Sequence, residues 1–220
     1  MLSIRFFALA LLVVLLLDAC SKCGPDVNLG ELPLTANSRL FIPYADDAVL
    51  EFVDQDGERH RVQSTLGREI ETEELHIRFS CEENVWRTQY EYYESEMERI
   101  AFSDVDGEPV FSCRLRTSCE YDDNLTALAI IDHLRVDVSL FNKSYGAVKV
   151  ITEEREGEVS DEFQERLLIR SRFVGDTLLY GRSFANVYSS EQGDQAFYYN
   201  QQQGALAFTI DEENYWVLAN

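Results

Sequence analysis

Most of the chain after residue 39 consists of short stretches in which apolar and polar residues alternate. In the clearest of these, Leu134, Val136, Val138 and Leu140 alternate with charged or hydroxyl-bearing residues. A period of two residues places the apolar side chains on one face of a β-strand. The stretches are joined by connections too short for the crossovers that parallel strands need. The sequence therefore predicts an all-β, mainly antiparallel fold, either a β-sandwich or a half-open barrel or meander.

The boundaries of this domain follow from the turn residues. Residues 20–38 contain Gly24-Pro25, Gly30 and Pro33 without a hydrophobic period, which predicts a tether before the folded part. Residues 39–220 are expected to form one antiparallel domain, with an alternative of two halves at about 39–120 and 121–220. Few or no helices are expected apart from the signal segment, and only residues 125–133 are a candidate. The highly charged segment 153–165 is expected to be a loop or hairpin tip.

Two Asp-Gly segments resemble each other fifty residues apart. Phe52-Val53-Asp54-Gln55-Asp56-Gly57-Glu58 is followed by Phe102-Ser103-Asp104-Val105-Asp106-Gly107-Glu108. An EF-hand requires an Asp five residues before the Gly and a Glu six residues after it, and both segments lack them. Asp-Gly between β stretches is a common hairpin turn, so we expect two similar hairpins, with a weak surface cation site as the alternative.

The N-terminus carries an export signal. A cationic start is followed by twelve apolar residues, 6–17, and then by Leu17-Asp18-Ala19-Cys20. Twelve helical residues span about 18 Å, too short to cross a hydrocarbon core of about 30 Å. The segment therefore resembles a signal peptide, residues 1–19, and its last four residues resemble the lipobox of bacterial lipoproteins. An alternative is cleavage near Ala19 by ordinary signal peptidase.

The lipobox resemblance implies a lipid on Cys20 and a membrane anchor. In that family the cysteine becomes the mature N-terminus and carries a diacylglycerol and an amide-linked acyl chain. Ser21 stands where an acidic residue would be the family's signal for inner-membrane retention, so the resemblance favours the outer membrane. The expected partner is the membrane itself, reached through the covalent lipid.

The other four cysteines, Cys23, Cys81, Cys113 and Cys119, suit disulfides in an exported protein. Four cysteines allow two bridges in three connectivities. A local bridge between Cys113 and Cys119 is one option, and pairing of Cys81 with either of them is another.

The charge and the motifs exclude several classes of function. With 40 acidic and 19 basic residues the net charge is -21, which disfavours nucleic-acid binding. The three histidines, His60, His76 and His133, are not at metal-ligand spacing, and we find no phosphate-binding loop or catalytic triad. We therefore expect no catalytic, metal or cofactor site. A hydrolase based on paired carboxylates, such as Glu69 with Glu71, is a remaining alternative.

The C-terminal part, with Asn186-Val187-Tyr188, Phe197-Tyr198-Tyr199, Gly204, Phe208 and Trp216, resembles small all-β envelope lipoproteins. That resemblance implies a location but no activity. We expect a non-enzymatic binding or structural module. The alternative is a carrier or chaperone whose apolar ligand lies in a barrel cavity lined by Trp86, Tyr90 and Tyr92, the aromatic face of a strand predicted at residues 85–93.

Overall fold

The structure is a computed structural model that describes residues 24–80, 89–140, 143–169, 171–209, 211 and 213–219. The signal peptide, the lipobox, Cys23, Cys81 and Trp86 lie outside these residues, so the predictions made for them stay predictions. None of the helices in the described ranges is long and apolar enough to cross a membrane.

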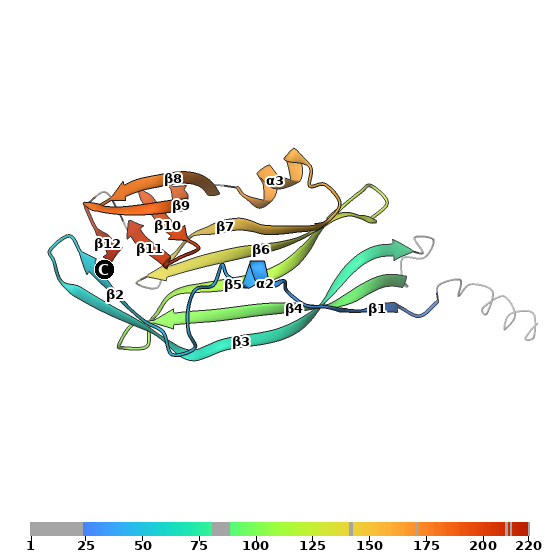
Figure 1. Ribbon diagram of the computed structural model, residues 1–220, viewed down its shortest axis with the longest axis horizontal. Helices are drawn as coiled ribbons and strands as arrows, with labels where there is room; N and C mark the ends of the chain where they lie inside the picture. The colour runs from blue at the N-terminus through green and yellow to red at the C-terminus, as the bar shows by residue number, and fades with distance from the viewer. Residues whose placement is uncertain are drawn as a thin grey trace, which may run out of the picture.

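The described residues form twelve strands and two short helices (Figure 1). In chain order they are β1 (Val27–Leu32), α2 (Ala36–Arg39), β2 (Val49–Asp54), β3 (Arg59–Ser80), β4 (Gln89–Ser103), β5 (Pro109–Tyr121), β6 (Ala127–Leu140), β7 (Lys143–Glu156), α3 (Asp161–Leu167), β8 (Ser171–Leu179), β9 (Arg182–Gln192), β10 (Gln195–Asn200), β11 (Gly204–Thr209) and β12 (Tyr215–Leu218).

The strands form one sheet that curls into a nearly closed barrel. Consecutive strands pair from β2 to β7 and again from β8 to β12, and β12 pairs with β2 to join the two runs. The remaining edges, β7 and β8, meet where the backbone N–H of Lys149 donates to Ser171 Oγ at 2.7 Å. All pairs are antiparallel except β1 with β4. The predicted all-β antiparallel fold is confirmed, in its barrel form.

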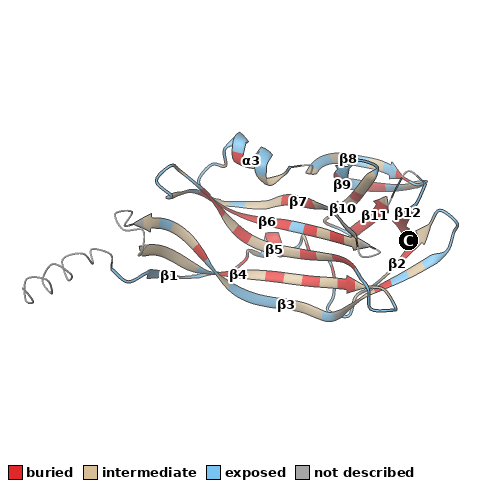
Figure 2. Ribbon diagram, turned by 180° about the vertical axis from the view of Figure 1, so that it is seen from behind, coloured by how far each residue is buried: buried red, intermediate tan, exposed pale blue. Residues whose placement is uncertain are grey.

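Alternation along the long strands directs one face of the wall inward. On β5, Phe111, Cys113 and Leu115 are buried, whereas the residues between them are half-buried. Large aromatic side chains fill the interior, and buried positions run along the middle of the wall in Figure 2. The rings of Phe102 and Phe111 stack with centroids 4.5 Å apart, and Tyr44 packs edge-on against Phe102 at 4.8 Å.

Residues 34–44 form a plug that belongs to this core. Leu34, Ile42 and Tyr44 are at most 5% exposed and lie in the main hydrophobic cluster. The Tyr44 hydroxyl accepts a 2.6 Å hydrogen bond from the backbone N–H of Ala205. A Cβ on Gly204 would lie 1.8 Å from that hydroxyl oxygen, so glycine is required there. The predicted tether is therefore wrong from β1 onward, because β1 pairs with β4 and the plug packs inside the barrel.

A buried carboxylate holds the plug to the barrel wall. Glu98 is fully buried, and its two oxygens lie 2.9 Å from Arg39 Nη1 and 2.8 Å from Arg68 Nη1. Arg39 ends α2, and Arg68 also donates to the backbone carbonyl oxygen of Tyr44. Burial raises the pKa of Glu98, although both guanidinium groups oppose that rise. The pair of arginines thus neutralises a carboxylate that the fold has removed from water.

The two Asp-Gly segments are hairpin turns of one design, as predicted. In each, the first Asp accepts from the backbone N–H groups two and four residues later, as Asp54 does from Asp56 and Glu58. The glycines, at φ +81° and +86°, occupy the left-handed position. A third copy follows Asp122, where Leu125 takes the left-handed position at φ +55°. The turn thus tolerates a side chain at a position that normally favours glycine.

Three local predictions are wrong. Residues 125–133 belong mostly to β6 because their β-branched and apolar residues pair with β5 and β7. The charged segment 153–165 ends β7 and then begins α3, where Ser160 caps the helix and its hydroxyl accepts from Phe163 N–H. A division into halves near residue 120 does not occur, since β5 and β6 pair continuously across that turn.

The local disulfide is also wrong. Cys113 and Cys119 are both buried and unpaired. They lie on one extended strand, where six residues span about 20 Å, far beyond the Cα separation of about 4.4–6.8 Å that a disulfide allows. The pairings that involve Cys81 lie outside the described residues and stay predictions.

Candidate functional site

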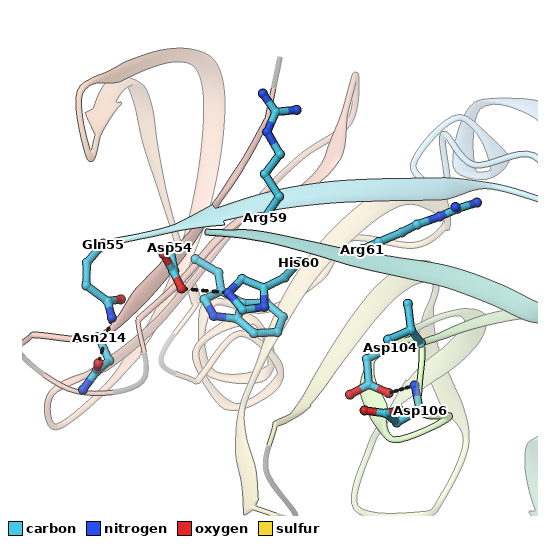
Figure 3. Close-up of a pocket in the computed structure, with 10 residues that line it drawn as sticks. Asp54, Gln55, Arg59, His60, Arg61, Asp104, Asp106 and Asn214 are labelled. Atoms are coloured by element: carbon cyan, nitrogen blue, oxygen red, sulfur yellow. Dashed lines mark hydrogen bonds and ion pairs between the residues drawn. The ribbon is translucent and has the colours of Figure 1, made fainter. Parts of the chain in front are cut away.

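A pocket of about 520 Å³ lies at the end of the barrel where the β2–β3 and β4–β5 turns approach each other (Figure 3). We call it the end pocket. It is lined by Asp54, Gln55, Arg59, His60, Arg61, Asp104, Val105, Asp106, Asn214 and Trp216. Two of its walls are thus the paired Asp-Gly turns, and the third comes from the C-terminal strand.

The floor of the end pocket is an imidazole stacked on an indole. The rings of His60 and Trp216 have centroids 4.1 Å apart and planes inclined by only 10°. Trp216 is placed by pairing opposite Asp54, and His60 is placed by pairing opposite Phe52. His60 Nε2 lies 2.8 Å from Asp54 Oδ2, so the carboxylate fixes the orientation of the ring.

The charges in the end pocket come mainly from carboxylates. The hydrogen bond with His60, helped by the backbone N–H groups of Glu58 and Asp56, lowers the pKa of Asp54. Asp104 and Asp106 face the floor from the β4–β5 turn in Figure 3. Arg59 points away from them and pairs with Glu51. The pocket therefore combines an aromatic floor with a rim that carries three carboxylates and the guanidinium groups of Arg59 and Arg61.

Three side chains in this region could hold a metal ion. One ligand atom from each of Asp54, Glu58 and His60 lies within 4.8 Å of the others, the single such group in the described residues. Carboxylate oxygen and imidazole nitrogen are the ligand atoms that Zn²⁺ takes in proteins. The second hairpin has the same turn, but Val110 stands where the first has His60. The arrangement is thus special to the first hairpin.

In the sequence, His60 has no second histidine at metal-ligand spacing, so it was not marked as a site residue. Its side chain is 29% exposed, and what makes the position distinctive is Trp216, which is 156 residues away along the chain. No local pattern connects the two residues, because the β2–β12 pairing is what closes the barrel. The resemblance between the two Asp-Gly segments was the available signal, since these segments form both turns that border the end pocket.

The other two histidines lie elsewhere. His133 is 5% exposed, and its Nδ1 has no hydrogen-bond partner. Burial, together with the positive charges of Arg116, Lys149 and Arg135, lowers the pKa of His133 to about 4. His76 joins Phe79, Tyr90, Tyr92 and Tyr121 in a half-buried aromatic cluster at the other end of β3.

The tyrosines named in the sequence analysis lie in different parts of the barrel. Tyr199 is fully buried in the core, and its hydroxyl donates to the carbonyl oxygen of Phe41. Tyr90 and Tyr92 are half-buried in the aromatic cluster, whereas their neighbour Tyr93 packs against the smaller core around Leu75. The wall therefore uses both faces of β4 for packing near its start.

Comparison with known proteins gives no match: no protein-family model, curated protein or solved structure is significantly similar to this chain.

Proposed function

We propose that this protein is a lipid-anchored binding module of the bacterial envelope, held in the outer membrane through Cys20, which binds a small ligand in the end pocket. The observation that carries the proposal is the position of that pocket, at the opposite end of the barrel from Gly24, the first described residue.

The two ends are separated by the length of β3. Gly24, the first described residue, donates from its backbone N–H to Gln89 at the start of β4. The end pocket lies beside Arg59, where β3 begins. The start of β3 and the start of β4 lie at opposite ends of the barrel (Figure 1). A strand of 22 residues is at most about 70 Å long. A lipid on Cys20, only four residues before Gly24, would therefore leave the end pocket far from the membrane surface.

The lining of the end pocket favours a small ligand with a cationic group. Asp104 and Asp106 offer carboxylates on one side, and the stacked His60 and Trp216 offer a flat aromatic surface on the other. Organic cations bind well where an aromatic face and carboxylates converge. The pocket is also within the usual size range for small-molecule sites.

The barrel interior favours this proposal over the carrier alternative. The positions that would line a central cavity are occupied by packed rings, among them Phe52, Phe102 and Phe208, each at most 1% exposed. The plug residues 34–44 fill more of the same space. A carrier would need to move these side chains before an apolar ligand could enter.

Two measurements test the proposal separately. Mass spectrometry of the mature N-terminal peptide is expected to find Cys20 acylated, and an unmodified peptide that begins elsewhere would refute the anchor. For the pocket, Trp216 fluorescence is followed during titration with spermidine in a Trp86→Phe background. We expect saturable quenching that Asp104→Asn weakens about tenfold, the usual effect of losing a charge-assisted hydrogen bond.

The matched control is Asp122→Asn. It alters the same kind of turn at the opposite end of the wall, and its titration is expected to follow that of the unchanged background protein. Quenching that does not saturate, or that is equal in the Asp104 and Asp122 variants, would refute the binding site.

A further inference from the structure

The outer face of the barrel wall carries a row of four basic residues on four neighbouring strands. Arg99 on β4 is the direct partner of Arg114 on β5, Arg114 is the partner of Arg135 on β6, and Arg135 is the partner of Lys149 on β7. Adjacent strands are about 4.8 Å apart, so the basic row extends over about 14 Å. No other residue type interrupts it.

The burial pattern places the basic row on the outside. Ile100, Cys113, Val136 and Val148, each next to a member of the row along its strand, are fully buried in the core. Successive side chains on a strand point to opposite faces, so the row points away from the core. Its members are half-buried or exposed. One step along the strands, the half-buried Arg116 is the direct partner of His133, which is buried.

The charges of the basic row are poorly compensated. In the described part of the chain, the Nε atoms of Arg99 and Arg114 are buried without a hydrogen-bond partner, and so is Nδ1 of His133. Arg135 pairs with Asp137, and Arg116 pairs with Glu73. Glu69, the cross-strand partner of Arg99 on β3, lies at the border of the row.

Such an arrangement is unfavourable unless something binds to it. Like charges directly opposite each other on neighbouring strands destabilise a sheet. This chain has 40 acidic residues against 19 basic ones, so a basic residue placed at random would more often have an acidic neighbour. Burial and the nearby Arg135 also lower the pKa of Lys149, which reflects the positive potential of the row.

We propose that the basic row is a binding site for a ligand that carries two or three phosphate groups. Guanidinium groups match phosphate oxygens in two-pronged geometry, and the half-buried side chains of Arg99 and Arg114 lie side by side on neighbouring strands. The length of the row fits a few linked phosphates. Glu69, Glu71 and Glu73 border it along β3 and would repel a longer polyanion that crosses the wall.

This site is separate from the end pocket and has the opposite ligand preference. None of the residues that line the end pocket belongs to the basic row. The phosphates could be carried by a free oligophosphate or by a phosphorylated lipid headgroup, and both offer the same chemistry to the arginines.

The test is calorimetric titration of the full mature protein with sodium tripolyphosphate at low ionic strength. We expect saturable binding that Arg114→Gln with Arg135→Gln weakens at least tenfold, as expected when charge-assisted hydrogen bonds are removed. The matched control, Arg166→Gln with Arg172→Gln, removes two exposed arginines elsewhere and should bind as the unchanged protein does. Vesicles that contain phosphatidic acid form the second arm, which distinguishes a lipid source from a free one.

Thermal unfolding provides an independent readout. Because the double change at Arg114 and Arg135 removes like charges from the row, it should raise the melting temperature without ligand. It should also abolish the stabilisation that tripolyphosphate gives to the unchanged protein. Binding to neither probe, or equal binding by the row variant and the control, would overturn the proposal.

Discussion

The hydrogen bond from Ala205 to Tyr44 offers the most direct test of the plug. Tyr44→Phe removes only the hydroxyl oxygen, and the apolar ring that packs against Phe102 remains. Ala205 is fully buried and Tyr44 is 5% exposed, so water cannot replace the lost acceptor without a rearrangement. A buried N–H group left without a partner costs about 1–3 kcal/mol of unfolding free energy. In a domain of this size that corresponds to a melting temperature lower by about 2–12 °C.

The assay is urea unfolding followed by circular dichroism, with thermal unfolding alongside. The matched control is Tyr180→Phe, whose hydroxyl is hydrogen-bonded to Thr209 at an exposed position where water can take its place. That variant should change the unfolding free energy by less than about 0.5 kcal/mol. Equal small effects from both variants would refute the reasoning, because they would mean that the plug is not fixed to β11 by this bond.

Three further predictions address the turns, a histidine and the thiols. Leu125→Gly should raise the unfolding free energy by about 0.5–1 kcal/mol because it relieves a left-handed backbone. Gly107→Ala in the equivalent turn should lower the unfolding free energy by about 1 kcal/mol for the opposite reason. Urea titrations measure both changes, and the reverse order would contradict the shared turn design. The folded pKa of His133, about 4, lies below its ordinary 6.5, so the unfolded chain takes up the proton first and stability should fall by up to about 3 kcal/mol as pH decreases from 6.5 to 4. His133→Gln should flatten that pH profile, and an unchanged slope would exclude this residue as its cause. Burial raises the pKa of the Cys113 thiol and raises that of Cys119 to about 11. Iodoacetamide at pH 8 should therefore label either cysteine only after denaturation, as read by peptide mass spectrometry. Rapid labelling of the native protein would show that the thiols are accessible.

Local patterns predicted the parts of the fold that depend on neighbours in sequence. The alternation through Leu134, Val136 and Val138 predicted the inner face of β6, and those residues are buried. The Asp-Gly segments predicted two hairpins because an Asp side chain holds the turn from within five residues. These features need no knowledge of the rest of the chain.

Features that depend on distant pairing could not be predicted in this way. Residues 20–38 have turn residues and no period, so their composition indicated a tether. Contacts with distant strands, among them β3, β4, β10 and β11, explain why the plug is buried. The basic row comes from four strands whose registers decide which side chains meet. An overall charge of -21 indicates an acidic surface and conceals this local excess of positive charge.

The plug also constrains the order in which the barrel can be completed. Tyr44 and Ala205 are 161 residues apart, and Phe41 and Tyr199 are 158 apart, so the plug acquires these contacts only after nearly the whole chain has been released. Contacts of such separation form slowly because the intervening chain must lose its freedom first. A chain shortened before β11 would keep its long strands but leave Tyr44 exposed. The contact between the N-terminal and C-terminal parts of the chain therefore forms last. A truncated product would be recognisable by its loose N-terminal segment.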